Sequence, residues 1–326
     1  MTNPRLPVLS ADGLFLFFAE KTGYEKNLQG WLPSPCLSAG LNGNIIFYTT
    51  LDCVYYVTLY SVLSRRYGIR TYSFSLMPNH IHSFQEALTR EVFVTFNYET
   101  AKEFAKGYNA WHGRDGALFD SPFGSAPKKV GKQIRSCFSY INNNAPVGRL
   151  SDHILDYKWN LMAYGKDQWP YSSKMLRDKA SAGLRRSLGL VDHNFKKGRP
   201  MGYEIQSTIF EGLEPVEKKQ LLDYILSRYN FLDYSGLDKY FGSFDKAMLA
   251  MEANGGSEYD IQEDWDDYSV YSELSVIVRK AGFCLEHINF DSMLPDDKIM
   301  LANEMLTHSR ASRRQIEKYL HIAPGG

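Results

Sequence analysis

Two histidines, His80 and His82, stand two residues apart directly after the pair Pro78-Asn79. Alternate side chains of a β-strand point to the same face, so a strand that begins at His80 places both imidazoles on one side and Ile81 on the other. Two converging imidazoles suit a divalent metal ion with open coordination positions, provided that another element supplies at least one further ligand. A purely structural histidine pair is the alternative that these residues alone leave open.

The residues around the histidines predict two strands joined by a sharp corner. Large apolar residues alternate with serines along 72–76, which is the period of a half-buried strand. Pro78 cannot donate to a sheet ladder, and Asn79 favours a turn. We therefore predict a strand over 69–77, a corner, and a second strand over 80–85.

A helix predicted over 131–144 carries the other candidate side chains. Its apolar stripe contains Phe138, and Tyr140 and Asn144 lie on the opposite face. Their i, i+4 spacing makes them neighbours on the helix surface. Tyr140 is one of 22 tyrosines, so its position relative to the histidine strand, rather than its residue type, makes it a candidate for a chemical role.

Three segments resemble one family. The run Leu76-Met-Pro-Asn-His-Ile-His82 resembles the HUH signature of the single-tyrosine DNA transposases (the insertion-sequence 200-like group), and especially of the REP-associated tyrosine transposase branch. The segment 112–123 resembles the Arg-x-Gly-x-Leu-Phe-x-x-x-Phe segment of that group, and Tyr140-Ile-Asn-Asn-Asn-Ala-Pro-Val147 resembles its Tyr-Ile-x-x-Asn-Pro-Val pattern with Ala145 inserted. The resemblance covers about 44–175.

The resemblance implies a metal-dependent transposase that cleaves and rejoins single-stranded, hairpin-associated DNA through a 5′-phosphotyrosine intermediate. Tyr140 would be the nucleophile, and His80, His82 and Asn144 would bind Mg²⁺ or Mn²⁺. The inserted Ala145 leaves the third ligand open between Asn143 and Asn144, and the i, i+4 spacing from Tyr140 favours Asn144. Two other functions are considered: a non-catalytic DNA-binding regulator descended from such an enzyme, and a phosphoesterase, for which no further histidine follows His82 closely.

The pattern of elements predicts an α+β protein. A strand over 44–50, a helix over 53–66 capped by Asp52, the two strands around the corner and a helix over 89–111 give the order β-α-β-β-α. We expect a ferredoxin-like antiparallel sheet with helices on one face, forming a catalytic domain over 44–175. Residues 1–43 are treated as an N-terminal extension.

The second half of the chain predicts a basic linker or arm over 176–200 and a mainly helical C-terminal domain over 201–326. It ends in a helix-turn-helix at about 296–321, in which Ser312 and Gln315 form a capping box. This pair of helices resembles the DnaA-like C-terminal helix-turn-helix of many REP-associated transposases. The candidate DNA-binding residues are Lys128, Lys129, Lys132, Arg185, Arg186, Lys196, Lys197, Arg313, Arg314 and Lys318.

Composition sets the outer limits of these interpretations. The chain has 326 residues, with 37 Lys and Arg against 37 Asp and Glu. Its formal net charge is therefore zero and gives no indication of DNA binding, which usually requires an excess of basic residues. The charges are nevertheless segregated into a basic stretch over 174–199 and an acidic stretch over 252–273. No secretion signal or membrane span is expected, and four scattered cysteines indicate buried thiols. We expect a cytoplasmic, nucleoid-associated protein with DNA as its partner, and leave a homodimer open.

Overall fold

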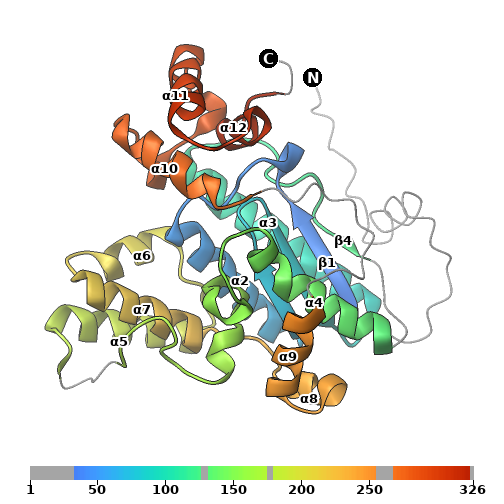
Figure 1. Ribbon diagram of the computed structural model, residues 1–326. Helices are drawn as coiled ribbons and strands as arrows, with labels where there is room; N and C mark the ends of the chain where they lie inside the picture. The colour runs from blue at the N-terminus through green and yellow to red at the C-terminus, as the bar shows by residue number, and fades with distance from the viewer. Residues whose placement is uncertain (1–32, 126–130, 175–178, 255–266, 324–326) are drawn as a thin grey trace, which may run out of the picture.

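The computed structural model describes residues 33–125, 131–174, 179–254 and 267–323. Over these residues the protein is α+β, with a small antiparallel sheet surrounded by helices (Figure 1). The sheet has four strands in the order β2-β3-β1-β4. Its strands are β1 (Ser34–Ala39), β2 (Arg70–Leu76), β3 (His80–Glu86) and β4 (Gly124–Ser125).

The first strand of the sheet is β1, and the strand predicted over 44–50 is wrong. A 3-10 turn at Leu41–Gly43 separates the two segments, and the residues after it are not extended in the sheet. The backbone N–H groups of Ile46 and Phe47 instead both donate to the carbonyl of Pro78 at 3.0 Å. The segment after β1 therefore holds the Pro78-Asn79 corner in place by hydrogen bonds. Because β1 is part of the sheet, the sheet domain begins before residue 44.

Helix α2 (Thr50–Tyr67) begins one turn earlier than predicted. Its N-cap is Thr49, and Asp52 occupies the third helical position, where it closes a capping box with Thr49. Asp52 was therefore wrongly predicted as the N-cap. Gly68 ends the helix with a φ of 65°, which confirms the predicted stop.

The sheet has helices on both faces rather than on one. Helices α2 and α3 (Arg90–His112) cover one face, where the ring of Phe74 lies 5.4 Å from that of Tyr60. Helix α4 (Gly131–Val147) lies on the opposite face, where Asn142 Nδ2 donates to Ser73 Oγ at 2.9 Å. The serines that alternate with apolar residues in β2 are buried under α4, because small side chains allow the helix to approach the sheet.

The buried carboxylate of Asp52 joins three helices. It accepts hydrogen bonds from the backbone N–H groups of Tyr48 and Thr49 at 3.1 and 2.8 Å, from His112 Nε2 at 3.0 Å and from the Tyr203 hydroxyl at 2.9 Å. His112 belongs to α3, and its Nδ1 faces the carbonyl of Ile288 at 3.1 Å. Both ring nitrogens of His112 thus face oxygen atoms, so the ring is held between α2 and the carbonyl of Ile288.

The segment predicted as a basic linker over 176–200 contains a packed helix. Helix α5 (Ala182–Lys196) buries Leu184, Leu188 and Val191 in a cluster with α6 (Tyr203–Phe210) and α7 (Pro215–Arg228). This cluster also contains Val54 and Val62 of α2. The apolar stripe of α5 therefore fixes the segment against α2 of the sheet domain.

The remaining helices form two groups that pack on different parts of the sheet domain, rather than one separate domain over 201–326. Helices α8 (Ser235–Phe241) and α9 (Phe244–Asn254) pack against α4. Helices α10 (Val270–Lys280), α11 (Pro295–His308) and α12 (Arg313–Leu320) share a core cluster with Ile45. The capping box of Ser312 and Gln315 is confirmed at the start of α12. No helix in the described ranges is long and apolar enough to cross a membrane.

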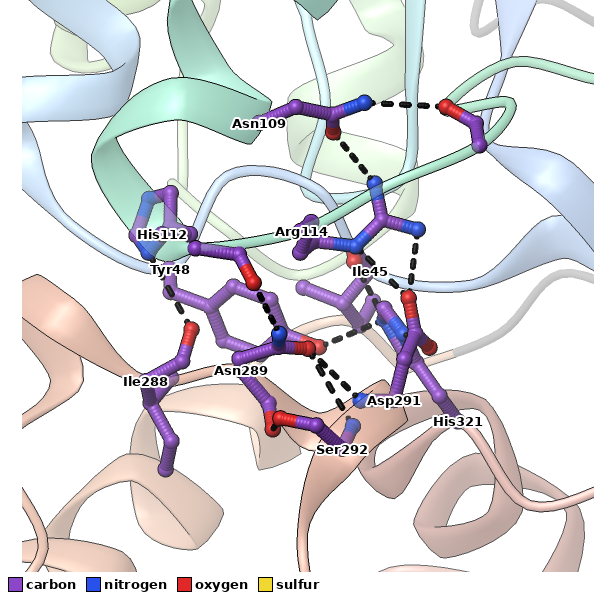
Figure 2. A network of polar contacts seen from close by, with 12 residues as sticks. Ile45, Tyr48, Asn109, His112, Arg114, Ile288, Asn289, Asp291, Ser292 and His321 are labelled. Atoms are coloured by element: carbon purple, nitrogen blue, oxygen red, sulfur yellow. Dashed lines mark hydrogen bonds and ion pairs between the residues drawn. The ribbon is translucent and has the colours of Figure 1, made fainter.

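A polar network holds α10–α12 against the sheet domain (Figure 2). Asp291 accepts from Arg114 Nε at 2.6 Å and pairs with His321 Nδ1 at 2.7 Å. The other ring nitrogen of His321 lies 3.0 Å from the carbonyl of Ile45. The hydrogen bond from His321, together with the charge of Arg114, holds the pKa of Asp291 well below its ordinary value. The helical unit is thus joined to the segment that braces the histidine corner.

Candidate metal and nucleophile site

The two histidines lie side by side on β3, facing α4. Their ring centroids are 4.7 Å apart and their planes are nearly perpendicular. Both side chains are buried, because β3 is an inner strand of the sheet and α4 covers this face. The Tyr140 ring lies 5.2 Å from that of His82. Thus β3 and α4 bring together three of the candidate residues.

Burial keeps both imidazoles neutral at neutral pH. It lowers the pKa of His82 to about 4. Burial also lowers the pKa of His80 well below its ordinary value, with smaller effects of the same sign from His82 and Lys318. A neutral imidazole is the form that binds a metal ion, so the low-dielectric setting leaves the nitrogen lone pairs available.

Hydrogen bonds around His80 select one tautomer. Asn79 Nδ2 donates to the carbonyl of Gly43 at 3.1 Å, which leaves its Oδ1 as an acceptor 2.7 Å from His80 Nδ1. Nδ1 of His80 therefore carries the proton, and Nε2 keeps its lone pair. An outer partner of this kind fixes the ring orientation of metal-binding histidines.

The neighbouring imidazole contains an unsatisfied buried atom. Nε2 of His82 is buried and has no hydrogen-bond partner among the described residues. Unpaired buried nitrogens are rare in proteins, and one beside a second neutral imidazole fits a divalent cation. No group of three or more His, Cys, Asp or Glu side chains that could hold a metal ion occurs in the described ranges, and the third ligand implied by the sequence resemblance is an amide.

Asn143 and Asn144, two successive asparagines of α4, make different contacts. Asn143 Nδ2 donates to the carbonyls of Ser139 and Met251, both at 2.8 Å, so this side chain joins α4 to α9. Asn144 Nδ2 donates to the carbonyl of Tyr140 at 2.9 Å. The amide oxygen of Asn144 is then the atom that could bind a cation. Helix α4 continues through Ala145 to Val147, so the insertion does not shift Asn144 from the face of Tyr140.

We predict that alanine substitutions at Asn144 and Asn143 affect different properties. Asn144→Ala should weaken Mn²⁺ binding by about tenfold or more, with little change in stability. Asn143→Ala should leave Mn²⁺ binding unchanged and lower the free energy of unfolding by about 1–3 kcal/mol, because the buried carbonyl of Met251 loses its donor. Calorimetric titration with Mn²⁺ and urea unfolding measure the two effects. The reverse pattern would assign the third ligand to Asn143.

The structure adds two neighbours of the histidines that the sequence reasoning missed, Tyr268 directly before α10 and Lys318 of α12. The Tyr268 ring lies 6.0 Å from that of His80, and the Tyr268 backbone N–H donates to the carbonyl of Gly148 at 3.0 Å. Lys318 of α12 is close enough to lower the pKa of His80 by its charge. No local sequence signal marks either residue, because both reach the site through folding of distant segments.

The candidate DNA-binding residues do not gather on one element. Lys128 and Lys129 lie outside the described residues, and Lys132 is exposed at the start of α4. Among the other candidates, Arg185, Arg186 and Lys196 of α5, Lys197 directly after α5, and Arg313 and Arg314 of α12 are exposed. Lys318 of α12 is half-buried. Helices α5 and α12 lie at opposite ends of the molecule (Figure 1), so the two sets present separate basic surfaces.

Comparison of this chain with protein-family models, with curated proteins and with solved structures found no match. The interpretation of the site therefore depends on its own geometry. That geometry is a neutral histidine pair with one orphaned nitrogen, next to a half-buried tyrosine on a facing helix.

Proposed function

We propose that the protein is a metal-dependent DNA transposase or strand transferase in which Tyr140 attacks a phosphodiester of single-stranded DNA. The observation that carries this proposal is the position of the Tyr140 ring, 5.2 Å from His82, whose Nε2 is buried without a partner in the described part of the chain. A nucleophile next to a pair of neutral imidazoles that could bind a cation is an arrangement that suits metal-assisted phosphoryl transfer.

The sheet supports the same proposal. Its strands follow the chain order β1-α2-β2-β3-α3-β4, and the spatial order is β2-β3-β1-β4 with every pair antiparallel. We infer from this order a ferredoxin-like arrangement, to which α4 has been added on the second face. In that arrangement the histidines lie on an inner strand and the tyrosine on the added helix.

The proposed reaction is a transesterification. His80, His82 and Asn144 would hold a Mg²⁺ or Mn²⁺ ion, which would offset the negative charge that develops on the scissile phosphate. The Tyr140 hydroxyl loses its proton and forms a bond to phosphorus, while the bond to the 3′-oxygen breaks and that oxygen takes a proton. The products are a 5′-phosphotyrosine and a free 3′-hydroxyl. Because the new phosphodiester retains the energy of the old one, a second strand can be joined without an external energy source.

The test uses a pool of labelled single-stranded hairpin oligonucleotides, incubated with the protein in Mn²⁺ or in EDTA and run on denaturing gels. We expect a protein-linked DNA band in Mn²⁺ and none in EDTA. Comparison of 5′- and 3′-labelled pools identifies the side of the cut that remains attached. Binding of a cognate oligonucleotide with no covalent band would instead indicate a DNA-binding regulator.

A further inference from the structure

Tyr268 lies in the segment that leads into α10, and its half-buried ring is next to the histidine pair. The ring centroid of Tyr268 is 6.0 Å from that of His80, and the two planes are inclined at 61°. On the other side of the pair, the Tyr140 ring meets the His82 ring at 84°. Two aromatic rings from different parts of the chain therefore flank the histidines, and the proposed reaction uses only that of Tyr140.

The segment that contains Tyr268 is bonded to the end of α4. The backbone N–H of Tyr268 donates to the carbonyl of Gly148 at 3.0 Å, and the backbone N–H of Gly148 donates to the carbonyl of Asn144 at 2.9 Å. Asn144 is the candidate third ligand of the metal ion. Two successive main-chain hydrogen bonds thus connect this ligand to Tyr268, so a shift of the segment before α10 would also displace the last turn of α4.

Gly148 provides the space that the Tyr268 ring occupies. A Cβ atom built on Gly148 would lie 2.7 Å from Cδ2 of Tyr268 and 3.3 Å from Cε of Met77, whereas carbon atoms pack best at about 3.5–4.0 Å. Gly148 does not have a positive φ, so close approach, rather than backbone freedom, explains a glycine at this position. The backbone N–H of Met77 donates to the carbonyl of His80 at 2.8 Å. The end of α4, the histidine corner and the Tyr268 ring therefore meet at Gly148.

The residues on both sides of Tyr268 are held in place by other elements. Nε2 of Gln315, on α12, donates to the carbonyl of Asp267 at 3.0 Å. The carboxylate of Asp267 accepts from Arg149 at 3.1 Å and from the backbone N–H of Ser269 at 3.0 Å. Because these contacts come from α12 and from the residues after α4, the position of the Tyr268 ring depends on the packing of α10–α12 against the sheet domain.

We propose that Tyr268 is a positioning residue of the candidate metal site, where it holds the histidine corner and the end of α4 together. The inference rests on the proposed function, because the metal site is part of it. Two candidate ligands lie on β3 and the third lies on α4, so their separation depends on contacts between these elements. Outer contacts that fix the ligands before the metal ion binds typically change its affinity by about 10–100-fold. Helices α10–α12 then complete the site without a ligand of their own.

Substitutions at the contact between Tyr268 and Gly148 test this role by calorimetric titration with Mn²⁺ in the absence of DNA. Tyr268→Ala should weaken Mn²⁺ binding by about tenfold, whereas Tyr268→Phe keeps the ring and should bind within about twofold of wild type. Gly148→Ala should weaken binding by about tenfold, because its Cβ displaces the ring. In the Tyr268→Ala background, Gly148→Ala should add about twofold or less, because the ring is already absent. Tyr98→Ala removes an exposed ring from α3 and should bind as wild type does.

A second measurement requires no metal ion. In EDTA, diethyl pyrocarbonate should modify His80 faster in Tyr268→Ala and Gly148→Ala than in wild type, and at the wild-type rate in Tyr268→Phe. Mass spectrometry gives the rate at each histidine, and the exposed His153 is the internal reference. Thermal unfolding of each variant checks that it remains folded.

Three results would overturn the inference: a wild type that binds no Mn²⁺, unchanged Mn²⁺ affinity or His80 modification in Tyr268→Ala, and equal weakening in Tyr268→Phe and Tyr268→Ala. The last result would assign the effect to the hydroxyl rather than to the ring. The proposed reaction fails separately. A wild type that binds Mn²⁺ with the expected pattern but forms no covalent DNA product would disprove the reaction and leave the role of Tyr268 standing.

Discussion

Tyr140→Phe is expected to abolish the covalent protein–DNA product, lowering its rate of formation by about 10³-fold or more, because the substitution removes the attacking oxygen. The aromatic ring is retained, so its edge-to-face contact with His82 at 5.2 Å is also retained. Binding of Mn²⁺ and of single-stranded DNA should therefore change little. The measurement is the yield of protein-linked DNA over time on denaturing gels, with the oligonucleotide that wild type cleaves best.

Two further tyrosines provide controls for this experiment. Tyr98→Phe removes a hydroxyl from an exposed position on α3 and should leave the covalent yield at the wild-type level. Tyr268→Phe tests the second tyrosine near the pair, whose ring lies 6.0 Å from His80. A covalent band that survives in Tyr140→Phe and disappears in Tyr268→Phe would identify Tyr268, directly before α10, as the nucleophile.

Asp52→Asn is expected to lower the free energy of unfolding by about 3 kcal/mol or more, because several buried donors lose their charged acceptor. The carboxylate accepts hydrogen bonds from Tyr48, Thr49, His112 and Tyr203, all of which are donors in this arrangement. An amide has only one acceptor oxygen, and its NH₂ group would face donors that already point at the site. Urea unfolding followed by circular dichroism measures the change.

Asp245→Asn is the control for charge removal alone. The Asp245 side chain is 73% exposed and pairs with Lys166 at the surface, so this substitution should change the free energy of unfolding by less than about 1 kcal/mol. If Asp52→Asn were as mild as Asp245→Asn, the buried network would not be the element that joins α2, α3 and α6. If both substitutions strongly lowered the free energy of unfolding, the loss of one negative charge, rather than of the buried network, would explain the effect.

Local patterns in the sequence were sufficient for the corner and for several helices. The alternation before Pro78 predicts β2, and the two-residue spacing of His80 and His82 predicts their common face, because both depend only on the period of a strand. Gly68 and the capping box at Ser312 were also predicted correctly, since helix ends depend on backbone groups within one turn.

Strand β1 could not be predicted in this way. It contains Pro35, Ser34 and Ser38, which are poor indicators of a strand, and it is extended because it pairs with β3 and β4. The apolar run at Ile45 and Ile46 has a strand-like composition but braces the corner instead, with its two side chains in different core clusters. Pairing partners distant in sequence decided both outcomes.

The same distinction between local patterns and distant contacts applies to the candidate site. The sequence by itself predicted that His80 and His82 share one face, because the period of a strand fixes the direction of their side chains, and its resemblance to a known family made Tyr140 a candidate. Only the tertiary structure decided that α4 covers the histidine face, and that Tyr268 and Lys318 lie near His80. These placements depend on burial of apolar surface between segments far apart in the chain, and no short-range pattern records which surfaces will meet.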